Sequence, residues 1–208
     1  MHHPSLESLA VLHAFDARLR PLWVLHHGPL HQPLSASGGG VKVTANLVAG
    51  GSIWELWWGG KQLINDYDFG RQIQVAFNLT NKAEVDNPTE AGSKYATASL
   101  GKPGYRQGSP LILSSVVGNK LRTATRPLQW NPSLHSGGAD HPVVWGGFIA
   151  KELELGFAGI QGVVRWTTVV HFPTAPKYLD AEVVTAYLQG DYTTYLAYDA
   201  VAKKLLEP

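Results

Sequence analysis

The sequence predicts an all-β domain with the architecture of an antiparallel β-sandwich. Runs in which apolar and polar residues alternate recur along the chain, for example over residues 52–58, and turn residues such as Gly59-Gly60 follow them. The composition also favours strands, because the chain has 22 Gly, 13 Pro and 7 Trp but only 16% charged residues. No predicted strand is followed by a long helical pattern, which argues against a parallel sheet with crossover helices.

The size and charge of the chain exclude several classes of function. Its 208 residues, 44% of them hydrophobic, suffice for one domain with its own core. The formal net charge of +1 gives no basic surface for nucleic acid, and no stretch approaches the ~18 apolar residues of a membrane-spanning helix. The chain has no cysteine, and His13 and Asp16 interrupt the region where a signal peptide would be apolar. We therefore expect no metal, cofactor, nucleic-acid or membrane partner.

Residues 1–40 differ in composition from the rest of the chain. They are rich in proline and end in Gly38-Gly39-Gly40. Their histidines are His2, His3, His13, His26, His27 and His31. These histidines show no regular spacing of metal ligands. We interpret residues 1–40 as a leader or loosely docked arm and residues 41–208 as the β-sandwich domain.

Strands are expected at nine places in the sandwich domain, and two long connections separate some of them. The expected strands are residues 41–48, 52–58, 72–77, 111–117, 120–125, 151–157, 163–172, 181–188 and 193–198. The long connections, residues 78–110 and 127–142, are rich in Pro and Gly. Long loops on a compact β scaffold often carry function.

The first candidate site is the segment of residues 65–74, between two expected strands. Its polar and aromatic side chains include Asp66, Tyr67, Asp68, Arg71, Gln72 and Gln74. Carboxylates, a guanidinium, amides and a ring are the groups that bind sugar hydroxyls and sugar faces. Gln72 and Gln74 are expected on a polar strand face opposite Ile73. The alternative is a turn in which the aspartates cap backbone amides and Arg71 pairs with one of them.

The two long connections supply further candidates. Glu90 lies in a bend shaped by Pro88 and Gly92 and is the leading functional carboxylate, with Asn87 as a ligand contact. The alternative is an Asx-type turn with a solvated Glu90. In the second connection, Gln129 and Trp130 offer an amide beside a stacking ring. The alternative for Trp130 is a partly buried place at the rim of the core.

The expected strand 163–172 places two more candidates on one face. Val164, Trp166 and Val170 alternate with Arg165 and His171, so the first three predict a core face. An Arg and a His on the opposite face suit a binding cleft, with His171 as a general acid or base. The alternative is a solvated outer face.

Two resemblances follow from these segments. Residues 50–65 read GGSIWELWWGGKQLIN. This stretch resembles the opening hairpin of galactose-mutarotase-like β-sandwich domains, in which a Gly-Gly pair precedes a strand, a turn and a Gly-Lys-x-Leu-Leu-Asn segment. Residues 68–74, 87–92 and 126–130, which read DFGRQIQ, NPTEAG and RPLQW, are similar to segments of a group of uncharacterised bacterial proteins.

The first resemblance implies a sugar-associated β-supersandwich. Aldose epimerases of this superfamily use paired histidines and a late glutamate, and their His-containing motifs are missing here, so mutarotase activity is not implied. Such domains usually run longer than residues 41–208, and the sequence stops just after an expected strand. The resemblance therefore predicts a supersandwich truncated at its C-terminus.

Three functions are compatible with these residues. The first is a glycan-processing hydrolase or lyase that uses Asp68, Glu90 and His171; a glycosidase needs two carboxyls ~5–5.5 Å or ~6.5–9.5 Å apart. The second is a non-catalytic carbohydrate-binding domain, and the third is a structural or interaction domain with an open sheet edge. In the first two, the partner is a carbohydrate or another polyhydroxylated ligand.

The candidates from different segments are expected to converge. Loops at one end of a sandwich cluster, so we expect Asp68, Arg71, Glu90 and Trp130 around one depression. Arg71 is expected to pair with Asp68 or Glu90, since a half-buried guanidinium needs a carboxylate partner.

Overall fold

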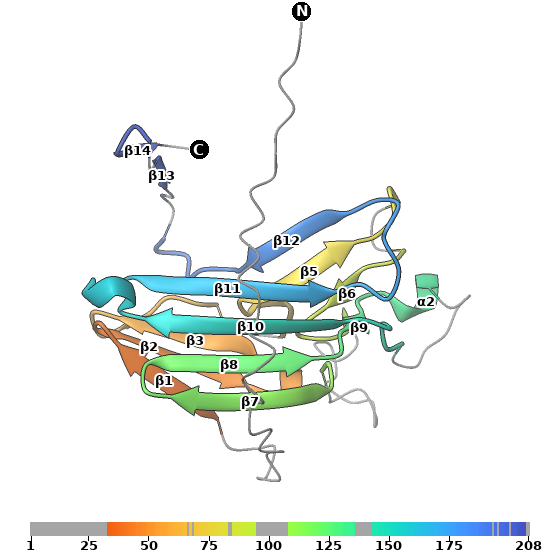
Figure 1. Cartoon of the computed structure of the whole chain (residues 1–208), viewed down its shortest axis with the longest axis horizontal. Helices are drawn as coiled ribbons and strands as arrows, with labels where there is room; N and C mark the ends of the chain where they lie inside the picture. The colour runs from red at the N-terminus through yellow and green to blue at the C-terminus, as the bar shows by residue number, and fades with distance from the viewer. Residues whose placement is uncertain are drawn as a thin grey trace, which may run out of the picture.

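The chain folds as an all-β sandwich (Figure 1). The computed structural model describes residues 33–65, 67, 69–82, 85–94, 108–135, 143–192, 194, 196–199 and 201–206. The predicted fold class is confirmed, because these residues form antiparallel sheets with one short α-helix, α2 (Pro132–His135). Within the described residues, no helix is long and apolar enough to cross a membrane.

The N-terminal sheet has the order β1-β2-β3-β4. Its strands are β1 (Leu34–Gly38), β2 (Val41–Asn46), β3 (Ser52–Trp58) and β4 (Lys61–Gln62). The predicted strand 52–58 and its two-glycine hairpin are confirmed. β1 lies inside the segment interpreted as an arm, yet it pairs with β2 along its whole length and buries Ala36. The sheet therefore begins before residue 41.

The long sheet has the order β11-β10-β8-β7. Its strands are β7 (Leu111–Val117), β8 (Lys120–Thr125), β10 (Phe148–Leu155) and β11 (Val164–His171). The predicted strands 111–117 and 120–125 are confirmed, and β11 matches its prediction to within one residue at each end. β10 begins three residues earlier than expected, because Ile149 already faces the core and pairs with Val170.

The short sheet has the order β12-β5-β6-β9. Its strands are β5 (Gln74–Asn78), β6 (Pro88–Thr89), β9 (Leu128–Gln129) and β12 (Asp180–Thr185). β6 and β9 lie in the two connections that were expected to lack secondary structure. Each has only two residues, which is too few to show the alternation of a strand in the sequence. A separate hairpin contains β13 (Ala197–Asp199) and β14 (Lys204–Leu206).

The N-terminal and short sheets pack against the same face of the long sheet. Leu153 joins the core cluster of the N-terminal sheet, whereas Ile149, on the same face of β10, packs with Val75 and Phe77 of β5. Antiparallel pairing of Ile53 with Ile73 links β3 to the start of β5. The result is two layers, with the long sheet as one layer and the other two sheets side by side as the second.

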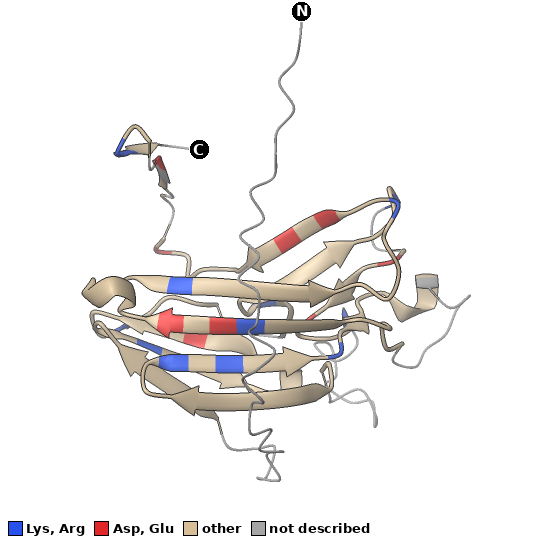
Figure 2. Ribbon diagram, in the orientation of Figure 1, with Lys and Arg blue, Asp and Glu red and all other residues tan. Residues whose placement is uncertain are grey.

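The outer face of the long sheet carries a lattice of ion pairs. Figure 2 colours their charged positions on neighbouring strands. Glu152 lies 2.6 Å from Arg122 Nε and 3.7 Å from Lys120 Nζ. Glu154 lies 2.5 Å from Arg165 Nη2 and 3.3 Å from Lys120 Nζ. Because opposite charges face each other across neighbouring strands, the lattice supports the strand register.

Glu152→Gln is expected to lower the free energy of unfolding by about 0.5–1 kcal/mol at pH 7. Partial burial disfavours the carboxylate, but the hydrogen bond and charge of Arg122, helped by Lys120 and Arg165, outweigh it and hold the pKa of Glu152 below its usual value. A lowered folded-state pKa stabilises the fold above the unfolded pKa, and this stability is lost as the pH falls. Urea unfolding at pH 7 and pH 3 should therefore show a difference only at pH 7, with Asp191→Asn, at an exposed position, as a control; an equal difference at both pH values contradicts the electrostatic origin.

Candidate functional site

The most buried charged groups of the described chain are Glu90 and Lys151, which form an ion pair inside the sandwich. β10 directs Lys151 to its inner face, between Ile149 and Leu153, and Glu90 directly follows β6. Their exposed fractions are 1% and 4%. Lys151 Nζ also donates to the Gly51 carbonyl oxygen at 2.7 Å, so the pair connects all three sheets.

Other groups complete the surroundings of this pair. Glu90 Oε2 accepts a hydrogen bond from the Val75 backbone N–H at 3.1 Å, and Lys151 Nζ lies 5.3 Å from the centroid of the Trp166 ring. Burial raises the pKa of Glu90 and lowers the pKa of Lys151, while the attraction between the two opposes both shifts. A closed, mutually neutralised pair of this kind leaves no carboxylate free for a ligand.

Glycine is required where the backbone passes this pair. Gly50 has φ +64° and Gly51 has φ +84°, the left-handed region in which side chains are strained. A Cβ on Gly50 would lie 2.2 Å from the Glu90 carbonyl oxygen. The turn at this glycine pair thus also allows close contact between the N-terminal and short sheets.

Lys151 was not among the candidates drawn from the sequence. The signal was present, because Ile149, Leu153 and Leu155 share one face of β10 and residue 151 falls on the same face. A lysine at an apolar strand position needs a buried partner. Nothing in the local pattern points to Glu90, which lies 61 residues away in the chain.

The expected exposed row of amides is wrong, because Gln72 and Gln74 are buried. Gln72 Oε1 accepts hydrogen bonds from Ser52 Oγ at 2.5 Å and from Asn46 Nδ2 at 3.3 Å. Gln74 Oε1 accepts from the Ala91 backbone N–H at 3.0 Å. Neighbouring segments cover this face and use the amide groups, so these two side chains hold the fold together instead of facing a ligand.

The two long connections do meet, through the pairing of β6 with β9. Gln129 is buried, and its Oε1 accepts from the Asn87 backbone N–H at 2.8 Å. The Asn87 side chain donates to Asn78 Oδ1 at 2.9 Å, and the Trp130 backbone N–H donates to the Asn87 carbonyl oxygen at 2.8 Å. Trp130 is partly buried. The two connections therefore meet, as the clustering of loops suggested, but the amide of Gln129 is already used between them.

The predicted depression around Glu90 is not formed as expected. The Glu90 carboxylate points to Lys151 inside the sandwich and not to Arg71. The Arg71 guanidinium lies 4.9 Å from the centroid of the Tyr67 ring, which is strongly exposed. Asp66 and Asp68 lie outside the described residues.

Arg165 and His171 share the outer face of the long sheet, as the alternation predicted. Arg165 is paired with Glu154, and its guanidinium lies 4.4 Å from the centroid of the Phe157 ring. His171 is exposed and stacks on Phe148 at 5.0 Å between centroids. Lys151 and Glu90 lie beneath the inner face of the same sheet. His171 and Glu90 therefore do not form one catalytic pair.

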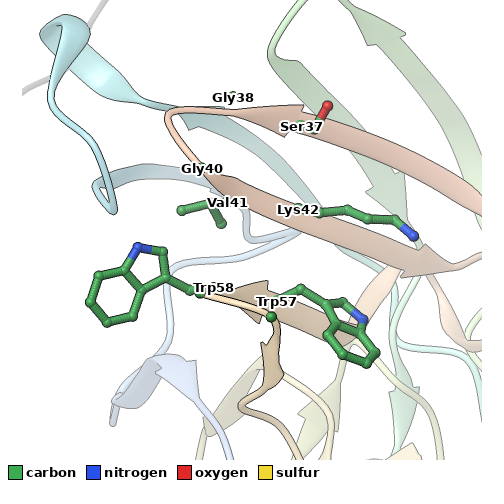
Figure 3. A pocket seen from close by; sticks show the side chains of 9 residues that line it. Ser37, Gly38, Gly40, Val41, Lys42, Trp57 and Trp58 are labelled. Carbon is green, nitrogen blue, oxygen red and sulfur yellow. The ribbon is translucent and has the colours of Figure 1, made fainter.

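An exposed aromatic and polar surface lies on the N-terminal sheet, in a shallow depression at the tips of its two hairpins (Figure 3). Strand pairing places Ser37, Lys42, Trp57 and Gln62 in one row across the outer face of this sheet. Trp57 is 37% exposed, and its indole and the Lys42 side chain extend toward the same side in Figure 3. We call these four residues the Trp57 row.

Trp58 lines the same depression as Trp57 but belongs to the opposite face of β3. Its side chain points away from Trp57, and it is 55% exposed (Figure 3). It lies on the same face as buried Val41 but is the last residue of β3, where the sheet extends beyond the core. Its indole lies near Gly162, which leaves one side of the ring open to solvent.

Comparison with models of known protein families, with curated proteins and with solved structures finds no match. Within the described residues, no group of three or more His, Asp or Glu side chains is arranged to hold a metal ion. The functional interpretation therefore depends on the geometry of this chain.

Proposed function

We propose that the chain is a non-catalytic carbohydrate-binding β-sandwich whose contact surface is the Trp57 row. The observation that carries this proposal is the half-exposed indole of Trp57 beside the ammonium of Lys42. An indole stacks on the apolar face of a sugar ring, while Lys42 and Ser37 are side chains that hydrogen-bond hydroxyls. The Gln62 amide is used within the sheet, because its Oε1 accepts from the Leu56 and Leu63 backbone N–H groups and its Nε2 donates to the Trp54 carbonyl oxygen. The shallow depression suits a chain of sugars lying along the surface.

The arrangement favours binding over glycan cleavage. Of the three acid–base candidates, Glu90 is closed off with Lys151, and His171 lies on the outer face of the long sheet. Asp68 lies outside the described residues. The resemblance of residues 50–65 to galactose-mutarotase-like domains is in keeping with a sugar ligand, since Trp57 belongs to that stretch.

Trp57→Ala is expected to weaken glycan binding at least about tenfold, because a buried aromatic contact dominates such interfaces. The wild-type chain would first be screened on a glycan array, and the best oligosaccharide titrated by calorimetry. Phe148→Ala is the matched control and should leave the affinity within about twofold, since Phe148 is also 37% exposed but lies on the long sheet.

Three results would contradict this assignment. They are the absence of glycan binding by the intact chain, an equal loss in the Trp57→Ala and Phe148→Ala variants, and release of new reducing ends from the bound oligosaccharide. The last result would instead support the hydrolase.

A further inference from the structure

The C-terminal part of the described chain exposes an unusual amount of apolar surface. Its large exposed apolar side chains are Tyr178, Leu179, Val183, Val184, Tyr187, Leu196, Val201, Leu205 and Leu206. In β12, Val183 and Val184 are 44% and 56% exposed, although consecutive strand residues point to opposite faces. Both faces of β12 are therefore uncovered. Exposed apolar surface on both faces of a strand is typical of an interaction site.

β12 is also an edge strand. It is the terminal strand of the short sheet and pairs only with β5 within the described residues. Such an edge presents backbone donors and acceptors to a further strand. Asp180 and Glu182 give β12 a negative charge (Figure 2).

The β13–β14 hairpin projects away from the sandwich (Figure 1). Hydrogen bonds from Tyr187 and Gln189 to the backbone of Arg71 and Leu63 fix the chain before it, so the hairpin extends beyond a held segment. A two-stranded hairpin standing alone is at best marginally stable in water. It needs a surface to pack on.

The hairpin has the complementary chemistry to β12. Val201 and Leu205 are exposed apolar residues, and Lys203 and Lys204 outweigh the single acid Asp199 in charge (Figure 2). The basic, apolar hairpin of one copy can therefore pack on the acidic, apolar edge of β12 in a second copy.

We propose that two copies of this chain form a two-fold dimer in which the β13–β14 hairpin of each copy packs on β12 of the other. Each copy contributes one hairpin and one β12 edge, so the two-fold assembly is closed and covers both surfaces of both copies. Adding a strand to the edge of β12 satisfies its backbone groups, and the alternating side chains provide specificity. The interface is independent of the Trp57 row.

Charge reversal tests this arrangement. One variant carries Asp180→Lys with Glu182→Lys, and the other carries Lys203→Glu with Lys204→Glu. Each alone places like charges across the interface, so sedimentation equilibrium should show dimerisation weakened at least tenfold. An equimolar mixture should form a heterodimer of near wild-type affinity, because both contacts then join opposite charges. Lys61→Glu with Arg126→Glu, which are exposed and belong to neither β12 nor the hairpin, should leave the dimer unchanged.

Cysteine trapping gives a second measurement, which does not depend on the charge-reversal variants. The chain has no cysteine of its own. Under oxidation, a mixture of Val184→Cys and Leu205→Cys chains should form the crossed disulfide dimer faster than either variant alone. A wild-type chain that stays monomeric at all concentrations, dimers insensitive to both reversals, or a mixture that yields no heterodimer and no crossed disulfide would each overturn the proposal.

Discussion

Lys151→Met is expected to lower the free energy of unfolding by about 3–5 kcal/mol at pH 7, because it leaves the Glu90 carboxylate buried without its cation. Methionine has a similar length to lysine and refills most of the space, so the loss reports charge and not a cavity. Urea unfolding followed by circular dichroism and by tryptophan fluorescence measures the difference.

The double variant Glu90→Gln with Lys151→Met is the control for this effect. It removes both charges, and its stability should return to within about 1–2 kcal/mol of the wild-type chain, since a buried ion pair contributes little net stability. If the single and double variants were equally unstable, the unpaired charge would not be the cause.

The deficit of the Lys151→Met variant is also expected to shrink on acidification. Burial raises the pKa of Glu90, and removing Lys151 removes the attraction that opposes this shift. A raised folded-state pKa favours the fold below the unfolded pKa, and this advantage is lost as the pH rises through the folded pKa. Urea midpoints of the variant and the wild-type chain should therefore converge as the pH falls from 7 to 4.

Phe77→Ala is expected to cost about 3–5 kcal/mol, the range for truncating a buried aromatic residue. Phe77 is buried on β5 beside Val75 and Ile149. Its ring lies 5.7 Å from that of Phe172, edge to face, and 6.2 Å from that of Trp145. These rings pack the short sheet against the long sheet. The cavity left by Phe77→Ala would weaken this packing on β5, the strand with which β12 pairs.

Tyr67→Ala serves as the comparison for Phe77→Ala, because Tyr67 is also aromatic but strongly exposed. Its cost should stay within about 0.5 kcal/mol. Thermal unfolding by calorimetry measures both variants. A cost below 1 kcal/mol for Phe77→Ala would mean that the aromatic cluster does not hold the two layers together.

The two proposed surfaces assign separate tasks to separate parts of the sandwich. The Trp57 row lies on the outer face of the N-terminal sheet, whereas the dimer contact uses β12 and the β13–β14 hairpin. Failure of dimerisation would leave the glycan proposal intact, and the reverse also holds. A dimer would present two Trp57 rows, and a polymeric glycan would then bind with avidity that short oligosaccharides lack.

The sequence by itself determined the strands that are specified by patterns among neighbouring residues. Residues 52–58, 111–117 and 120–125 form strands at the predicted residues, because alternation and flanking turns act over a few neighbours. The same alternation placed Arg165 and His171 on one outer face. β6 and β9 were missed because each has two residues and exists only through pairing with distant strands.

Only the tertiary structure decided which strand faces are covered and which charges meet. Alternation assigned Gln72 to the face opposite Ile73, but whether that face meets solvent depends on Ser52 and Asn46, which bind its amide. Glu90 looked like an exposed carboxylate until Lys151, 61 residues away, was brought to it. Burial and ion pairing are properties of the packed layers, since desolvation and Coulomb attraction depend on distances in space that no local pattern encodes.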